Sequence, residues 1–183
     1  MYAVISVLDP DSSKTVNGIW LQLCQVCGLQ AIYNLPTPHF TWLLADELKF
    51  DKAKSILAEI ASNSQQMTLH TFGVGIFTGE NPVLYLPLVK SREMISLHEA
   101  IWAQIQPLSE SPKLYYSPKL WVPHITLALN DLNPDNLACA VNKIAFDPIE
   151  LFVHVDNLSL VKQENDSQGE SLAEFALTVN DDA

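Results

Sequence analysis

The feature of this sequence that most constrains its fold is a five-residue pattern that occurs twice, 85 positions apart. Pro-His-Phe-Thr-Trp occupies 38–42 and Pro-His-Ile-Thr-Leu occupies 123–127, so each copy reads Pro, His, apolar, Thr, apolar. In a β-strand alternate side chains point to the same face, so the His and Thr of each copy would share one surface while the apolar residues enter the core. Proline cannot donate an N–H and is tolerated at the start of a strand, which predicts that each His stands at a strand entrance. The repetition therefore predicts two similar halves packed together, each presenting one imidazole and one hydroxyl.

Strand-like and helix-like patterns alternate around the two copies. Apolar periodicity, caps and turn residues place the expected elements along the whole chain. The expected strands cover 2–8, 40–45, 68–78, 83–89, 125–129, 149–155, 158–161 and 173–179. The first expected helix begins at 11–13 and ends at 28. The other expected helices cover 51–61, 91–107 and 134–144. Residues 79–82 predict a hairpin turn, and a polar turn at 163–170 is expected to join the last two strands. No low-complexity linker interrupts the order, so we expect 1–183 to form a single domain of mixed α and β structure.

The charge of the chain argues against a long nucleic-acid partner. Asp and Glu number 21 against ten Lys and Arg, which gives a formal net charge of −11. Arg92 is the single arginine, and the lysines do not cluster into a run. A protein that follows a phosphate backbone needs a basic stripe, so we expect no DNA partner. A small phosphorylated nucleotide or an RNA end remains compatible with this composition.

Two imidazoles that face one site suit the cleavage of a phosphodiester bond. An imidazole titrates near neutral pH, so one of His39 and His124 can remove a proton while the other donates one to the leaving oxygen. The hydroxyls of Thr41 and Thr126 would donate hydrogen bonds to the phosphoryl oxygens and stabilise the transition state. A zinc site would need a third protein ligand, and neither copy has a Cys, Asp or His nearby at ligand spacing. The pattern therefore indicates acid–base catalysis with no metal and no cofactor.

Paired His-x-Thr motifs at this separation resemble those of the 2H phosphoesterase superfamily, which includes the bacterial RNA 2′-5′ ligase-like proteins and cyclic phosphodiesterases. The resemblance extends over most of the chain. It implies an α+β, bilobal fold in which two pseudo-symmetric antiparallel sheets with outer helices surround a central cleft. It also implies chemistry on 2′,3′-cyclic phosphates or 2′-5′-linked small nucleotides, with His39, Thr41, His124 and Thr126 as the working residues.

The segment that precedes the second motif is expected to border the cleft. Residues 109–123 are rich in proline and carry aromatic and basic side chains. Tyr115, Tyr116 and Trp121 could stack on a base, with core packing as the alternative, and Lys119 could attract a phosphate. We name these four as candidate substrate-binding residues.

The three cysteines predict no disulfide framework. Cys24 and Cys27 form a Cys-x-x-Cys pair and Cys139 stands alone, an odd number without a second metal-binding pair. We expect thiols that fill space in or near the core. No apolar run reaches eighteen residues, and residues 1–8 lack the basic flank and cleavage site of a secretory signal. We therefore expect a cytoplasmic protein with no membrane partner, and a monomer.

Two other functions are compatible with the same residues. The first is RNA 2′-5′ ligation, which is the same chemistry run toward bond formation and predicts salt-sensitive binding of RNA ends. The second is a binding module that holds a nucleotide without converting it. Binding of a nucleotide without product formation would distinguish it from an enzyme.

Overall fold

The computed structural model describes residues 1–35, 37–162 and 169–179, and in this part of the chain it shows a mixed α+β fold. Four α-helices stand beside eleven strands in these residues. The helices are α1 (Pro10–Cys27), α2 (Phe50–Ser62), α3 (Arg92–Ile105) and α4 (Pro134–Ile144), and the short 3₁₀ helices are η1 (Ala31–Asn34), η2 (Gln106–Leu108) and η3 (Leu114–Tyr116). The strands are β1 (Tyr2–Val7), β2 (His39–Ala45), β3 (Glu47–Leu48), β4 (Met67–His70), β5 (Gly75–Phe77), β6 (Val83–Pro87), β7 (Ser109–Glu110), β8 (His124–Ala128), β9 (Phe152–Val155), β10 (Asn157–Lys162) and β11 (Glu170–Ala176). The expected α+β class is confirmed.

A seven-stranded antiparallel sheet runs through both halves of the molecule in the order β11-β10-β1-β2-β8-β6-β5. The strands of the two halves meet where β2 pairs with β8, through the single registered pair of Phe40 and Ile125. Two small sheets, β3 with β7 and β4 with β9, complete the strand pairing. The cleft predicted between the halves therefore has to lie where β2 meets β8.

The two halves repeat the same local arrangement around each motif. Strand β1 pairs with β2 so that Val7 faces His39, and β6 pairs with β8 so that Pro87 faces His124. In both pairs the register shifts once, between Val4 and Ile5 in β1 and between Leu84 and Tyr85 in β6. As a result Ile5 pairs with Thr41 and Tyr85 pairs with Thr126 at equivalent positions of the two halves.

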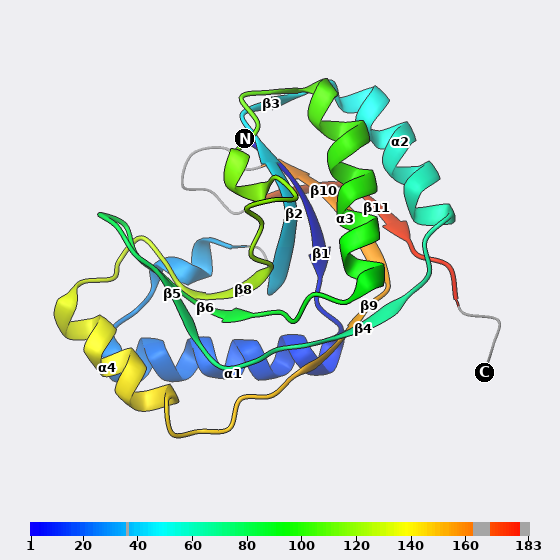
Figure 1. Cartoon of the computed structure of the whole chain (residues 1–183). Coiled ribbons are helices and arrows are strands. Elements are labelled where there is room, and N and C mark those ends of the chain that lie inside the picture. Colours follow the sequence, from blue (N-terminus) through cyan, green and yellow to red (C-terminus); the bar gives the residue numbers. More distant parts are fainter. Residues whose placement is uncertain (36, 163–168, 180–183) are drawn as a thin grey trace.

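The helices are divided between the two halves of the sheet. Helices α2 and α3 pack together against β2, β10 and β11, whereas α1 packs against α4 and β8 (Figure 1). Each helix buries its apolar stripe, as Val16, Ile19, Trp20 and Leu23 do in α1. Asp9 caps the start of α1 through its side chain, and Gly28 ends the helix in a left-handed conformation at φ 73°.

The expected strand at 68–78 is wrong in one respect, because the structure divides it into β4 and β5. Gly73 between them has φ 70°, a backbone conformation that glycine adopts without a steric cost. This turn lets β4 pair with β9 while β5 forms the predicted hairpin with β6. The predicted pairing of the last two strands is confirmed by β10 and β11, and the turn expected at 163–170 lies almost entirely outside the described residues.

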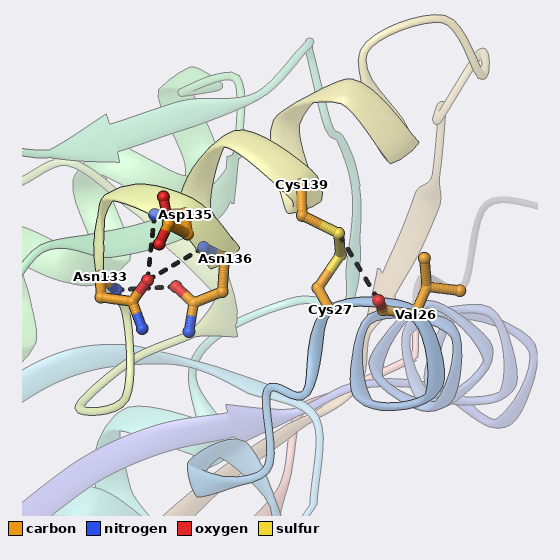
Figure 2. The surroundings of a disulfide bond; sticks show 6 residues. All are labelled: Val26, Cys27, Asn133, Asp135, Asn136 and Cys139. Atoms are coloured by element: carbon orange, nitrogen blue, oxygen red, sulfur yellow. Dashed lines mark hydrogen bonds between the residues drawn. A yellow bond between two sulfur atoms is a disulfide. The ribbon is translucent and has the colours of Figure 1, made fainter.

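The expectation of free thiols is wrong for two of the three cysteines. Cys27, at the end of α1, forms a disulfide with Cys139 on α4, with 5.7 Å between their Cα atoms (Figure 2). The pairing links positions 112 residues apart, so only the packing of α1 against α4 brings the two sulfurs together. Cys24 is a free thiol of intermediate exposure. Figure 2 also shows the capping box of Asn133 and Asn136 that starts α4.

Candidate active site

Both motifs open a strand, as the sequence predicts. His39 is the first residue of β2 and His124 is the first residue of β8. Phe40 and Ile125 are registered partners and are completely buried, so their side chains lie on the core face of the sheet. Extending this antiparallel register by one position in each direction places His39 opposite Thr126 and Thr41 opposite His124 on the other face. Directly opposed residues have Cβ atoms about 4.5–5.5 Å apart, so the sheet itself brings the four groups together.

One cavity of about 150 Å³ collects these four side chains, and we call it the motif cleft. Its walls combine the two imidazoles and two hydroxyls with mainly apolar neighbours. The motif cleft is lined by Met1, Ala3, Ile5, Leu35, His39, Thr41, Leu44, Tyr116, His124, Thr126, Leu129, Val161 and Gly169. The motif side chains are half-buried, so the imidazoles remain within reach of a ligand.

A hydrogen bond holds each motif imidazole in the same way. Nδ1 of His39 lies 2.7 Å from the carbonyl oxygen of Thr37, and Nδ1 of His124 lies 2.7 Å from that of Val122. A carbonyl oxygen only accepts, so Nδ1 must carry the proton in both rings. In the neutral rings Nε2 is then the basic nitrogen, and it is free to exchange a proton with a ligand.

The backbone on both sides of each imidazole is also held symmetrically. Leu8 N–H donates to the carbonyl of Pro38, and Leu88 N–H donates to the carbonyl of Pro123, at 3.1 and 2.9 Å. The indole of Trp121 donates to the carbonyl of Thr41 at 3.0 Å. The indole of Trp20, from α1, donates to the carbonyl of Thr126 at the same distance.

The environments of the two imidazoles lower both of their pKa values. Burial is the largest cause for each ring, because an apolar surrounding disfavours the charged form. The charge of His124, which lines the same cleft, lowers the pKa of His39 further. At a given pH the two rings therefore bind fewer protons than two free imidazoles.

A second and larger cavity adjoins the motif cleft on the side of His124, and we call it the side pocket. It measures about 440 Å³ and shares four residues with the motif cleft, including His124 and Thr126 but neither His39 nor Thr41. The side pocket is lined by Phe77, Val83, Tyr115, Tyr116, Leu120, Trp121, Val122, His124, Thr126 and Leu129. The two similar halves thus differ in the room they offer a ligand.

Aromatic residues of the β5–β6 hairpin pack against His124. The ring centroids of Phe77 and Tyr85 lie 4.9 and 5.1 Å from that of His124, and 4.1 Å from each other. Ile5 occupies the position in the other half that corresponds to Tyr85. Sequence reasoning missed Phe77 and Tyr85, because their contact with His124 depends on the register of β6 against β8.

The candidate substrate-binding residues fall into two groups. Three of them line the side pocket: Tyr116 is buried and lines both cavities, Tyr115 is 58% exposed at the rim, and Trp121 is buried. Burial raises the pKa of the Tyr116 phenol above its ordinary value. Lys119 is exposed and lines neither the motif cleft nor the side pocket.

A buried histidine outside the motifs fixes the segment that carries these residues. His98 on α3 is 2% exposed, and its Nε2 lies 3.1 Å from the carbonyl of Trp42 and 3.0 Å from that of Tyr116. Its ring stacks on Trp121 with 3.7 Å between centroids. Burial lowers the pKa of His98 to about 4, so the ring is neutral near pH 7 and Nε2 donates to the two carbonyls. His98 thereby ties Tyr116 to the motif strand β2.

Within the described ranges, no group of three or more His, Cys, Asp and Glu side chains is arranged to hold a metal ion. Across the same ranges, no helix has the length and hydropathy needed to cross a membrane.

Two β-α halves that each present a histidine and a threonine to one cleft define a protein of the 2H phosphoesterase class. The family model described as the 2′-5′ RNA ligase superfamily matches residues 8–167, so the chain belongs to that superfamily. No curated protein matches the sequence.

Two solved structures share the fold along nearly their whole length. One is described as a crystal structure of a phosphoesterase, with 17% sequence identity, a TM-score of 0.62 and 97% of each chain covered. Another is E. coli LigT complexed with 3′-AMP, with 16% identity, a TM-score of 0.61 and 97% of each chain covered. At these identities the likeness concerns the fold.

Proposed function

We propose that this protein is a metal-independent phosphodiesterase that hydrolyses 2′,3′-cyclic or 2′-5′-linked small nucleotides. The observation that carries the proposal is that both motif imidazoles and both motif hydroxyls line one cleft, with Nδ1 of each ring bound to a carbonyl. Each Nε2 is thereby free for proton transfer, and the two rings stand in equivalent positions on paired strands.

The reaction needs one neutral imidazole and one protonated imidazole. The neutral ring accepts a proton from water through Nε2 while the water oxygen forms a bond to phosphorus. The bond from phosphorus to the leaving ester oxygen breaks, and the protonated ring donates its Nε2 proton to that oxygen. One water is consumed. A cyclic phosphate opens to a phosphomonoester with a new hydroxyl on the same molecule, and a 2′-5′ linkage gives a phosphomonoester and a second molecule that carries the released hydroxyl. The two rings regain their starting protonation by exchange with solvent. The hydroxyls of Thr41 and Thr126 donate hydrogen bonds to the non-bridging oxygens as charge develops on them.

The side chains around the cleft suggest different roles for the other candidates. Tyr115 and Tyr116 would contact the group attached to the phosphate in the side pocket. Trp121 donates its N–H to the backbone carbonyl of Thr41 and stacks on His98. We therefore assign it a role in positioning Thr41, in addition to a contact with a ligand in the side pocket. Lys119 would act only as an exposed charge that attracts an anion toward the cleft.

Ligation of RNA ends would use the same two imidazoles in the reverse direction. Among the residues that the structure describes, no ionisable side chain lines either cavity apart from the imidazoles, Tyr115 and Tyr116, and the whole chain has one arginine. Binding of RNA ends draws its affinity from contacts between cations and phosphates, so this composition favours hydrolysis of a small substrate. The monomeric state and the cytoplasmic location remain predictions. The Cys27–Cys139 disulfide argues against the cytoplasmic location, because such bonds are rare in reducing compartments.

The test is to replace His39 and His124 singly with Ala and to assay 2′,3′-cyclic nucleotides and 2′-5′-linked dinucleotides. We expect each variant to lose at least about 10²-fold in kcat/KM, the lower end of what general acid–base catalysis contributes. The matched control is His70→Ala, because His70 is exposed on β4 and lines neither cavity. Turnover that is unchanged in both motif variants would exclude the proposal.

A further inference from the structure

Both motif threonines are held at their backbone carbonyls by a tryptophan from another part of the chain. The indole N–H of Trp121 donates to the carbonyl of Thr41, and that of Trp20 donates to the carbonyl of Thr126, each at 3.0 Å. Trp20 lies on α1, whereas Trp121 lies in the loop between η3 and β8. The two indoles thus come from different kinds of element, and each bonds to the same atom of its motif.

These two carbonyls point into the junction between β2 and β8. The Leu8 N–H donates to the carbonyl of Pro38, and carbonyl directions alternate along a strand, so the Thr41 carbonyl points away from β1 and toward β8. The equivalent bond in the other half directs the Thr126 carbonyl toward β2. Among the described residues, β2 and β8 share one registered pair. Each indole therefore bonds to a carbonyl that faces the line along which the two halves meet.

Each threonine also stands directly before an irregularity in the pairing of its own half. The register between β1 and β2 skips Trp42, which follows Thr41, and the register between β6 and β8 skips Leu127, which follows Thr126. An extra residue of this kind interrupts the ladder and changes the direction of neighbouring side chains. The ladder of each half therefore leaves the peptide unit after the threonine less constrained, and the indole supplies a constraint from outside the ladder.

Trp20 is placed to act on the site without touching a ligand. It is 3% exposed and lines neither the motif cleft nor the side pocket, whereas Thr126 lines both. A buried indole N–H needs an acceptor, and the acceptor of Trp20 is the motif carbonyl. Helix α1 packs against β8, so the indole approaches the strand from a rigid element. Fixing the carbonyl fixes the backbone of Thr126, and the direction of its hydroxyl depends on that backbone.

We infer that Trp20 is a positioning residue for Thr126, the counterpart of Trp121 at Thr41, and that the two indoles set the directions in which the motif hydroxyls donate to a phosphoryl oxygen. The inference rests on the proposed function and adds to it a residue of α1 that the substrate does not contact. A hydroxyl stabilises a developing charge best when its direction is set before the substrate binds. Trp20 sets that direction through the backbone of Thr126.

The first test removes the indole N–H and measures turnover of 2′,3′-cyclic AMP. One variant is Trp20→Phe, and the other carries β-(3-benzothienyl)alanine at position 20, in which sulfur replaces the N–H and the volume is kept. We expect kcat to fall about 10-fold while KM changes less than about twofold, because the placement of the donor matters most in the transition state. The matched control is Trp102→Phe, which should keep kcat because Trp102 is half-buried on α3 and lines neither cavity.

Double-mutant cycles then separate positioning from a role in the core alone. Thr126→Val and Thr41→Val each remove one motif hydroxyl and keep the shape of the side chain. In the Thr126→Val background the loss of the Trp20 N–H should lower kcat by less than about twofold, because the hydroxyl that it positions is absent. In the Thr41→Val background the same loss should still cost about 10-fold. A tryptophan that only fills the core would lower kcat by the same factor in both backgrounds.

A measurement without ligand tests the same role when turnover is absent. Three-bond NMR couplings to the γ-methyl carbons report the χ1 angles of Thr41 and Thr126 in the free protein. We expect one rotamer for each threonine in the wild type. In the benzothienylalanine variant, Thr126 should average between rotamers while Thr41 keeps its own.

The outcomes separate the inference from the proposed function. Turnover by the wild type, together with equal losses in the two threonine backgrounds or an unchanged Thr126 rotamer, overturns the inference and leaves the hydrolase standing. A wild type that does not convert 2′,3′-cyclic AMP, together with rotamer averaging confined to Thr126, overturns the hydrolase and leaves the role of Trp20 standing.

Discussion

Gly75 faces Tyr85 across the β5–β6 hairpin, and the Tyr85 ring fills the space that a Cβ atom at position 75 would need. The same ring packs against Phe77 and His124. A missing side chain at one position of the hairpin therefore sets how Tyr85 lies, and through it the packing of a motif imidazole. The equivalent place in the other half is taken by Ile5, so this arrangement belongs to His124 alone.

Gly75→Ala is expected to lower kcat/KM for a 2′,3′-cyclic nucleotide about 10-fold, equivalent to roughly 1.4 kcal/mol of transition-state stabilisation. The added methyl group must displace the Tyr85 ring, which then no longer supports His124. Steady-state kinetics and thermal unfolding check the result together. The control is Gly18→Ala, since Gly18 is exposed within α1 and a Cβ there meets nothing within 4 Å. It should keep activity and gain about 0.5–1 kcal/mol of stability. Unchanged kinetics in Gly75→Ala would contradict the positioning role of Tyr85.

The pH dependence of kcat/KM should be a bell with its maximum below pH 6.5. Burial lowers the pKa values of His39 and His124 below the ordinary 6.5, and the reaction needs one ring neutral and the other protonated. Activity falls at low pH as the base becomes protonated and at high pH as the acid loses its proton, so lowering both pKa values moves the whole bell toward acid. Initial rates between pH 4.5 and 8.5 provide the measurement. A maximum above pH 7.5 would count against this environment for the imidazoles.

Tyr115→Ala should raise KM for a cyclic nucleotide about fivefold with little change in kcat, because stacking of one base on one aromatic ring contributes on the order of 1 kcal/mol. Tyr115 lines the side pocket from an exposed position, so its loss leaves the core and the motif strands intact. The control is Tyr33→Ala, which removes a 41% exposed tyrosine outside both cavities. A fall in kcat with KM unchanged would place Tyr115 in the chemical step instead of in binding.

Loss of the Cys27–Cys139 disulfide should destabilise the protein by about 2–4 kcal/mol, since the bond closes a long loop and limits the unfolded chain. The change is Cys27→Ala with Cys139→Ala, measured by urea unfolding with and without reductant. Reductant should lower the stability of wild type but not of the double variant. Cys24→Ala is the control that keeps the bond. A thiol titration of the unfolded, unreduced protein should count one thiol, and a count of three would refute the pairing.

Much of the secondary structure and the motif strands could be predicted from local patterns. The His-apolar-Thr-apolar copies follow the period of a strand, and the prolines before them mark strand starts, so β2 and β8 were expected within one residue. Helix α4 was expected at its observed bounds because Asn133, Pro134 and the following apolar spacing all act within one or two turns. The division of 68–78 was not foreseen, since a glycine inside an apolar run fits both a strand and a turn until its partners are known.

The two equivalent strand entrances, each with a histidine and a threonine on one face, follow from the amino-acid sequence, because alternation along a strand is a local property of the backbone. The residues that surround them depend on how distant segments pack. The register of β6 against β8 brings Tyr85 to His124, the packing of α1 against α4 joins Cys27 to Cys139, and α3 sets His98 between Trp42 and Tyr116. These contacts join segments up to 112 residues apart, and no local pattern records which distant residue will fill a given space in a close-packed interior.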